Sequence, residues 1–263
     1  MGWCDIMDFG EEYYDRLYFA DLKGKEYRNP NGSIGHWGYQ NPMAEWVGAG
    51  FIATSWKNIF KLNKCNTDSG LCKALDVGCG RGTFVAYLRD VGVECWGFDF
   101  SEFAIKNPYP RCQKGWCIKH DATVIWPYGD KAFDLVLALD IMEHLFEPDI
   151  DFVIDELYRV SKKYVFLQIA VCGSGGLQGN SGFNGYILKK GDKVPIEFES
   201  MVVAGHVTVQ SRQFWIDKLL KNKEGVERKW RVRDDMVLDF IGKVPAAVID
   251  NWLKNAMIVM EKV

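Results

Sequence analysis

The residues of this 263-residue chain that could do chemistry gather at the ends of short apolar runs, and the first such place is a glycine-rich turn. Asp76 lies near the end of one run, and Gly78, Gly80 and Gly82 follow it at alternate positions. Glycines let the backbone approach a ligand closely, and a helix that begins just after them presents N–H groups to it. The third glycine comes one position too early for the dinucleotide pattern G-x-G-x-x-G, so the turn indicates a different ligand.

Acids follow the next apolar runs in the same way. Asp99 and Asp121 come after the second and third runs, and the fourth leads into Asp140, Glu143 and His144. An ionised carboxylate only accepts hydrogen bonds, and one carboxylate can bind both hydroxyls of a vicinal diol. Asp99 is therefore a candidate for a diol site.

In this order and at these spacings, the segments resemble the motifs of the class I (Rossmann-like) S-adenosylmethionine-dependent methyltransferases. The resemblance covers residues 73–170 and includes an acid before G-x-G-x-G, the acid of W-G-F-D, the Asp of H-D-A, and F-D-x-V followed by E-H-L. It implies that the chain binds S-adenosylmethionine and forms S-adenosylhomocysteine as product. Methyl transfer is an in-line displacement, so positioning of the acceptor and exclusion of water carry most of the rate.

The resemblance also implies which residues contact the cofactor. Asp76 would lie near its aminoacyl group, Asp99 would accept hydrogen bonds from both ribose hydroxyls, and Asp121 would face the adenine amino group. The full expected set is Asp76, Gly78, Cys79, Gly80, Gly82, Asp99, Phe100, Asp121, Ala122, Leu139 and Asp140.

On the acceptor side, His206, His144 and Tyr14 are the catalytic candidates, because a hydroxyl acceptor needs a group that takes its proton. A purely structural role stays open for each histidine. His206 can cap the predicted helix that starts at Ser211, and Glu143 with His144 can orient the helix that follows them. The expected substrate-binding residues are Tyr13, Tyr14, Tyr18, Trp37, His144 and His206.

Strand-like and helix-like segments alternate from residue 73 onward, which is typical of an open, mostly parallel sheet with helices on both faces. We predict strands at 73–77, 93–98, 116–120, 133–139, 164–170, 227–232 and 256–263. We predict helices at 43–60 and 83–91, after Ser101, from Pro148, after Ser211, and within 236–253. The predicted fold class is α/β, with a seven-stranded, mostly parallel Rossmann-like methyltransferase sheet, an N-terminal aromatic and helical lid, and an insertion after strand five.

We predict one methyltransferase domain over residues 1–263. Its parts are a lid at 1–70, a cofactor-binding half at 71–172, a Gly-rich insertion at 173–205 and an acceptor-side half at 206–263. Thirteen aromatic residues fall in the first 60 positions, and aromatic faces attract a sulfonium or a cationic substrate.

The predicted function is methyl transfer to an oxygen or nitrogen atom of a small molecule. The net charge of −3 is not that of a polycation that binds the phosphate backbone of nucleic acids. Two alternatives stay open. The first is a protein or RNA methyltransferase that uses the basic run 228–233, although charges that alternate with Trp230 and Val232 are also typical of an exposed edge strand. The second is a non-catalytic domain of the same fold that binds the cofactor or a partner.

The chain has eight cysteines and no C-x-x-C pair, so we predict no metal site and reduced, structural thiols. Cys65 with Cys72, and Cys112 with Cys117, are the pairs that could approach each other. No apolar run reaches the ~18 residues of a membrane span, and the first residues carry acids where a secretion signal has basic ones. We therefore expect a cytoplasmic protein.

Overall fold

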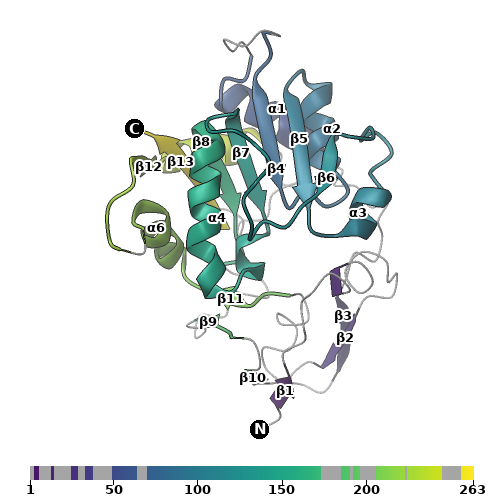
Figure 1. The fold of residues 1–263 in the computed structure, drawn as a ribbon, viewed down its shortest axis with the longest axis vertical. Coiled ribbons are helices and arrows are strands. Elements are labelled where there is room, and N and C mark those ends of the chain that lie inside the picture. Colours follow the sequence, from purple (N-terminus) through teal and green to yellow (C-terminus); the bar gives the residue numbers. More distant parts are fainter. Residues whose placement is uncertain are drawn as a thin grey trace.

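The computed structural model describes residues 3–5, 13–14, 25–28, 33–37, 49–63, 70–172, 185–189, 192–195, 205–222, 224–244 and 256–263. Seven strands form one sheet: β4 (Lys73–Val77), β5 (Glu94–Asp99), β6 (Cys117–Lys119), β7 (Phe133–Leu139), β8 (Ser161–Gln168), β12 (Trp230–Val232) and β13 (Met257–Lys262). Their order across the sheet is β12-β13-β8-β7-β4-β5-β6 (Figure 1).

The strands run mostly in one direction. β4 pairs in parallel with β5 and β7, β5 with β6, and β7 with β8. β13 is antiparallel to both of its neighbours, β8 and β12. The predicted fold class is confirmed, and the carboxyl ends of β4, β5 and β7 meet at one edge, where ligands of open α/β sheets bind.

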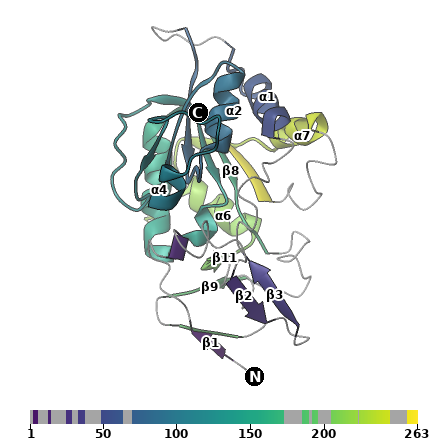
Figure 2. The same ribbon diagram turned by 90° about the vertical axis from the view of Figure 1, so that its right-hand side faces the viewer.

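Helices cover both faces of the sheet (Figure 2). On one face α1 (Ala49–Ile59), α2 (Thr83–Asp90) and α7 (Asp234–Lys243) share a core, and on the other face α4 (Glu147–Val160) and α6 (Arg212–Leu220) share a second core. Side chains of β7 alternate between these cores, Leu135 and Leu137 in the first and Val136 and Ala138 in the second. This double burial explains why the strand is apolar almost throughout.

The predicted helix starts are confirmed by their caps. Ser101 accepts a hydrogen bond from the amide of Ala104 at 3.0 Å and opens α3 (Glu102–Lys106), and Ser211 accepts one from Phe214 at 3.2 Å and opens α6. Pro148 lies in the first turn of α4.

Some boundaries differ from the prediction. α1 begins at Ala49, and residues 43–48 of the helix predicted there lie outside the described residues. β12 covers only three residues of the predicted strand 227–232, because Glu227 forms an isolated bridge with Lys221 instead of extending the sheet.

Short two-stranded ribbons lie beyond the end of the sheet where α4 begins, as both views show (Figures 1 and 2). β1 (Trp3–Asp5) pairs with β10 (Lys193–Pro195), β2 (Lys25–Arg28) with β3 (Ile34–Trp37), and β9 (Tyr186–Ile187) with β11 (Thr208–Val209). β1, β2 and β3 come from the predicted lid, β9 and β10 from the predicted insertion, and β11 from the predicted acceptor-side half, so parts of all three flank this end of the sheet. Residues 173–184 of the Gly-rich segment lie outside the described residues.

The aromatic side chains of α1 belong to the core. Trp56 and Phe60 are buried and contact Phe166 of β8, with ring centroids 5.4 Å and 6.1 Å apart. The helical part of the predicted lid therefore covers the sheet itself. Among the described helices, none combines the length and apolar character that crossing a membrane requires.

Candidate functional site

The glycine-rich turn after β4 is tied to the end of β5. The amide of Gly80 donates to Oδ2 of Asp99 at 2.8 Å, and the amide of Ser101 donates to its Oδ1 at 2.8 Å. Gly78, Gly80 and Gly82 all have positive φ, at 70°, 53° and 79°. These are left-handed conformations that favour glycine, so the predicted turn has the close backbone approach that its glycines indicated.

Three acids line the same edge of the sheet: Asp76 and Asp99, which are buried, and Asp140, which is exposed. Asp76 of β4 is 2 % exposed, and burial together with the nearby Asp99 raises its pKa to about 8. Asp140 follows β7 in a left-handed conformation with φ 50°, and its carboxylate accepts hydrogen bonds from Nε2 of Gln168 at 3.0 and 3.1 Å. Desolvation raises the pKa of Asp140 to about 6, and the Gln168 bonds oppose that rise.

Asp121 shapes its own turn after β6. Its Oδ1 accepts hydrogen bonds from the amide and the hydroxyl of Thr123, both at 2.8 Å. The carbonyl oxygen of the next residue, Ala122, accepts a hydrogen bond from Nε1 of Trp126 at 2.9 Å. Both residues thus sit in a rigid loop, and their contact with adenine stays a prediction.

Two histidines meet beyond the carboxyl end of β7. His144 ends the short helix η2 (Met142–His144), and its ring centroid lies 5.0 Å from that of His206, at an interplanar angle of 84°. Nδ1 of His144 lies 3.0 Å from the carbonyl oxygen of Gly205. A carbonyl oxygen only accepts, so this nitrogen carries the proton and the lone pair of the neutral ring is on Nε2.

Both rings are uncharged at neutral pH. Burial lowers the pKa of His144 to about 4. Burial, together with the repulsion that a second proton on the adjacent His144 would cause, lowers the pKa of His206 well below its ordinary value. A neutral imidazole can accept a proton or bind a metal ion.

Tyr14 connects this pair to the glycine-turn side of the site. Its hydroxyl lies 3.3 Å from Nδ1 of His144, and its ring meets Phe100, the residue after Asp99, at a centroid distance of 6.2 Å. Tyr13 packs edge-on against Tyr14 at 5.1 Å. Burial raises the pKa of both tyrosines, so both are neutral phenols. The structure thus brings Tyr13, Tyr14, His144 and His206 together, and their role toward an acceptor stays a prediction.

Glu143 lies next to the two histidines and is fully buried. Its Oε1 accepts a hydrogen bond from the amide of Ala170 at 3.0 Å, and its backbone carbonyl accepts one from the amide of Val207 at 2.8 Å. Burial and the nearby Asp140 raise its pKa well above the ordinary value. Glu143 therefore joins β7 to the chain after β8 and to the strand region of β11.

The remaining predicted site residues are placed less directly. Tyr18 lies outside the described residues, and Trp37 is described only as part of the β3 backbone. Cys79 points its side chain at Gly97, where an added Cβ would lie 2.7 Å from its sulfur, so its thiol faces the interior of the sheet. Phe100 and Leu139 are half-buried at the ends of β5 and β7.

The prediction that the cysteines are reduced thiols is confirmed for five of them. Cys79, Cys95, Cys112, Cys117 and Cys172 are free, and the sulfurs of Cys112 and Cys117 lie 3.6 Å apart beneath the glycine turn. The prediction is wrong for Cys72, which is disulfide-bonded.

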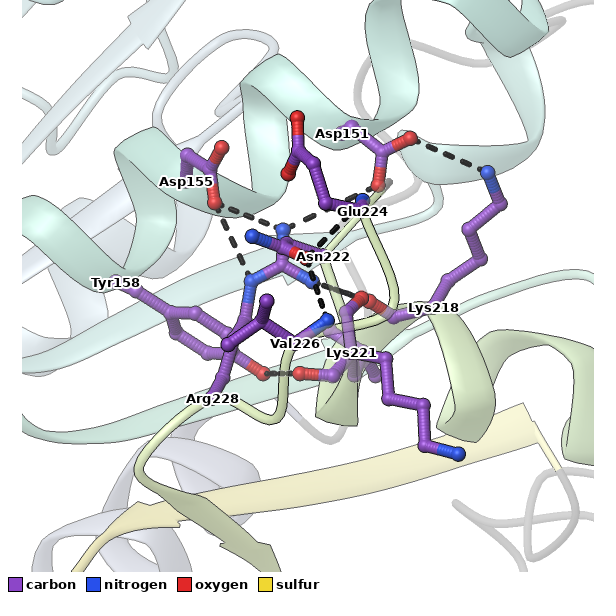
Figure 3. Close-up of polar contacts among 10 residues, drawn as sticks. Asp151, Asp155, Tyr158, Lys218, Lys221, Asn222, Glu224, Val226 and Arg228 are labelled. Atoms are coloured by element: carbon purple, nitrogen blue, oxygen red, sulfur yellow. Dashed lines mark hydrogen bonds and ion pairs between the residues drawn. The ribbon is translucent and has the colours of Figure 1, made fainter.

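Three arginines of the basic run 228–233 pair with carboxylates of the same chain. The guanidinium of Arg228 donates to Oδ1 of Asp155 on α4 at 2.8 Å, and to the carbonyl oxygens of Lys218, at 2.7 Å, and Lys221 at the end of α6 (Figure 3). Its side chain is only 9% exposed, so Arg228 joins the two helices instead of presenting its charge to solvent.

Two further cations of the run share one carboxylate. Arg231 donates to Oε2 of Glu261 on the neighbouring strand at 2.6 Å, and Arg233 pairs with the same oxygen. Arg233 also pairs with Asp235 at 2.6 Å. The prediction that this run forms an edge strand is confirmed, because β12 is the outermost strand of the sheet.

Three residues that no sequence motif indicated also shape the site. Gln168 donates to Asp140, the carbonyl oxygen of Gly205 accepts a hydrogen bond from Nδ1 of His144, and the hydroxyl of Tyr186 donates to the carbonyl oxygen of His206 at 2.9 Å. Gly205 has φ 86°, and an added Cβ would lie 2.8 Å from Nδ1 of His144, which explains why glycine stands before His206. None of these positions belongs to a local motif, since each acts on a segment far away in the chain.

Comparisons with known proteins agree with this geometry. Residues 75–167 match a family described as Methyltransferase domain. The chain is 29% identical over 149 residues to Ubiquinone biosynthesis O-methyltransferase of Pelagibacter ubique (strain HTCC1062), covering 56% of this chain and 59% of that protein. The chain thus spans about three-fifths of the length of this curated relative.

One solved methyltransferase structure shows the same fold. The plantazolicin methyltransferase BpumL, in complex with a pentazolic desmethylPZN analog and SAH, has a TM-score of 0.54 at 16% identity, over 85% of this chain and 88% of that one. The PH0226 protein of Pyrococcus horikoshii OT3 is 32% identical over 36% of this chain and 49% of that chain, with a TM-score of 0.33.

Proposed function

On the premise that this chain carries a class I (Rossmann-like) S-adenosylmethionine-dependent methyltransferase domain, we propose that it transfers a methyl group to an oxygen or nitrogen atom of a small molecule. The cofactor is S-adenosylmethionine. The observation that carries the proposal is the placement of Tyr14, whose hydroxyl lies 3.3 Å from His144 and whose ring packs on Phe100 beside Asp99. One side chain thus joins the expected cofactor edge to a pair of neutral histidines.

The residues at this edge fit the cofactor. Asp99 is oriented by two backbone amides, and a carboxylate has about four acceptor sites, enough for a diol as well. An added Cβ at Gly78 would lie 3.0 Å from Ile141, so the turn has no room for a side chain at this position. When bound, the cofactor supplies a methyl group on a positively charged sulfur. Asp76, Asp99 and Asp121 would hold its aminoacyl, ribose and adenine parts.

On the acceptor side, the chain supplies position and a proton acceptor. A hydroxyl acceptor must lose its proton, and Nε2 of His144 has a lone pair because Nδ1 donates to Gly205. Its pKa of about 4 makes His144 a weak base, so we assign most of the effect of His144, His206 and Tyr14 to orientation and exclusion of water.

The alternatives find less support. An RNA acceptor would use the run 228–233, but Arg228, Arg231 and Arg233 pair with carboxylates of the same chain. A non-catalytic domain would not need Tyr14, the half-buried His144 and the buried His206 beside the expected cofactor edge. We also propose a cytoplasmic location, because five of the six cysteines with described side chains are free thiols.

The proposal is tested by incubating the purified chain with methyl-labelled S-adenosylmethionine and a panel of phenols, alcohols and small amines. We expect S-adenosylhomocysteine to form only with an acceptor present, and His206→Ala to lower turnover while leaving cofactor affinity intact. Cofactor binding without turnover on any acceptor would favour the non-catalytic domain. Turnover on RNA with steep salt dependence would favour the nucleic-acid alternative.

A further inference from the structure

One carboxylate and two imidazoles converge on the acceptor side of the site. Glu143, His144 and His206 each offer one donor atom, and these atoms all lie within 4.8 Å of one another. The three side chains come from two segments that the fold joins through the bond from Val207 to the carbonyl of Glu143. The cysteine spacing predicts no metal site, because the chain has no C-x-x-C pair, and His144 and His206 are far apart in the sequence.

One oxygen of the Glu143 carboxylate has no partner among the residues that the structure describes. Oε1 accepts a hydrogen bond from the amide of Ala170, whereas Oε2 is buried and makes no hydrogen bond with any of them. Leaving a buried acceptor unsatisfied costs about 1–3 kcal/mol, and more for a charged group. A bound cation would satisfy this oxygen and hold the carboxylate in its ionised form.

His144 has the orientation of a metal ligand. Its Nδ1 donates to the carbonyl oxygen of Gly205 at 3.0 Å, which places the lone pair on Nε2. Ligating histidines in proteins are held in this way, with one ring nitrogen donating to a carbonyl or carboxylate and the other binding the ion. Gly205 allows the contact, because a side chain there would collide with the ring.

His206 is fixed beside this ring. It is 6% exposed, and the amide of Val207 and the hydroxyl of Tyr186 anchor its backbone to Glu143 and β9. Imidazole nitrogens and carboxylate oxygens bind a transition metal at about 2.0–2.2 Å, so donors about 3–4 Å apart are needed. The three donor atoms lie within 4.8 Å of one another without an ion, so binding requires them to move closer together.

We propose that Glu143, His144 and His206 bind a divalent first-row transition-metal ion. Two nitrogen donors and one oxygen donor suit such ions better than Mg²⁺ or Ca²⁺, which prefer oxygen ligands alone. Three protein ligands leave coordination positions open, and an oxygen atom of the acceptor can take one. This role of the ion rests on the proposed function, whereas the binding of the ion does not.

The binding site is tested with Mn²⁺ on the full chain, without cofactor or acceptor, by calorimetry and by the Mn²⁺ electron paramagnetic resonance signal. Mn²⁺ is the probe because it prefers oxygen and nitrogen to thiolate, so the thiols beneath the glycine turn do not compete. We expect 1:1 binding, with affinity at least tenfold weaker in Glu143→Gln and in His206→Asn. Glu143→Gln keeps an oxygen for the Ala170 amide, and thermal midpoints report whether each variant is folded. His120→Asn, a histidine outside the cluster, should bind Mn²⁺ like the unmodified chain.

No binding by the unmodified chain at millimolar Mn²⁺ overturns the site, and so does unchanged affinity in both folded variants. The role of the ion is tested separately by chelation. We expect chelator-treated protein to lose methyl transfer and Mn²⁺ to restore it. Full transfer after chelation overturns the acceptor role alone. Mn²⁺ binding at these residues in a chain that transfers no methyl group overturns the proposed function and leaves the metal site standing.

Discussion

The amide of Gly80 donates a 2.8 Å hydrogen bond to the carboxylate of Asp99, and this bond locks the glycine turn after β4 to the end of β5. The other carboxylate oxygen accepts the amide of Ser101, which is also the cap of α3. Asp99 is thus oriented from both sides before any ligand arrives. Preorganisation of this kind reduces the entropy lost on binding, so Asp99 is the residue from which the cofactor assignment is most directly tested.

We expect Asp99→Ala to weaken binding of S-adenosylmethionine by more than tenfold, about 1.4 kcal/mol or more, as measured by calorimetry. The substitution removes the expected diol acceptor and leaves the amide of Gly80 without its partner. Asp99→Asn should also weaken binding, because an amide has one acceptor oxygen where the carboxylate has two.

Asp239→Ala is the matched control for this substitution. Asp239 lies on the exposed side of α7, in a pair with Lys243 at 2.6 Å. Its loss should leave cofactor affinity unchanged. Equal affinity in Asp99→Ala and the unmodified chain would refute the cofactor placement.

Gly82→Ala should destabilise the fold by roughly 1–3 kcal/mol, measured by denaturant unfolding. Its φ of 79° is strained for alanine, and the added Cβ would lie 2.5 Å from the sulfur of Cys112 and 2.8 Å from that of Cys117. Neither sulfur can easily move, because both lie in a packed cluster with Cys79.

Gly242→Ala should have the opposite effect on the free energy of unfolding. Gly242 lies inside α7, and an added Cβ would have no neighbour within 4 Å. Alanine is preferred over glycine in a helix interior by about 0.5–1 kcal/mol, so this variant should be slightly stabilised. Equal effects of the two substitutions would show that the thiol cluster does not constrain the turn.

The fold and the cofactor edge could be predicted from the sequence because their signals are local. Asp76 and the three glycines after it lie within seven residues, and the alternation on β7 follows directly from burial on both faces. Caps at Ser101 and Ser211 are equally local, which is why both helix starts were found.

The contacts that orient the expected acceptor-side residues could not be predicted in the same way. His144 and Gly205 are 61 positions apart, so only the folded chain shows that one orients the other. Arg228 and Asp155 are 73 positions apart. Arg228 looks like part of a basic surface in the sequence, but in the folded chain it connects α4 to α6. Trp56 is one of the many aromatic residues of the predicted lid, but on α1 its side chain is buried in the core.

Arg228→Ala should lower the free energy of unfolding by about 2–3 kcal/mol, since charged hydrogen bonds are worth about 1.5–3 kcal/mol. The substitution removes the tie between α4 and α6 and leaves the carbonyls of Lys218 and Lys221 without this donor. Urea unfolding measures the change, with Lys229→Ala, the neighbouring cation of the run, as the control. A loss of acceptor binding without a loss of stability would instead show that the run contacts substrate.

Finally, the stability of the cofactor-free protein should fall as the pH rises from about 6 to 8, with Asp76 as a cause. Burial and the nearby Asp99 raise the pKa of Asp76 to about 8 in the folded chain, while an unfolded chain has the ordinary value near 3.8. Between these values the folded state binds the additional proton. Stability from this group is therefore fully present at low pH and is lost as the pH rises through the folded pKa.

Asp76→Asn isolates this effect, because asparagine has nearly the same shape and does not titrate. The difference in thermal midpoint between the unmodified chain and Asp76→Asn should change in favour of the variant as the pH increases from 6 to 8. Asp239→Asn, an exposed substitution on α7, should show no such change relative to the unmodified chain. A pH-independent difference for Asp76→Asn would mean that Asp76 stays ionised in the folded protein, and that the buried edge stabilises its charge before the cofactor binds.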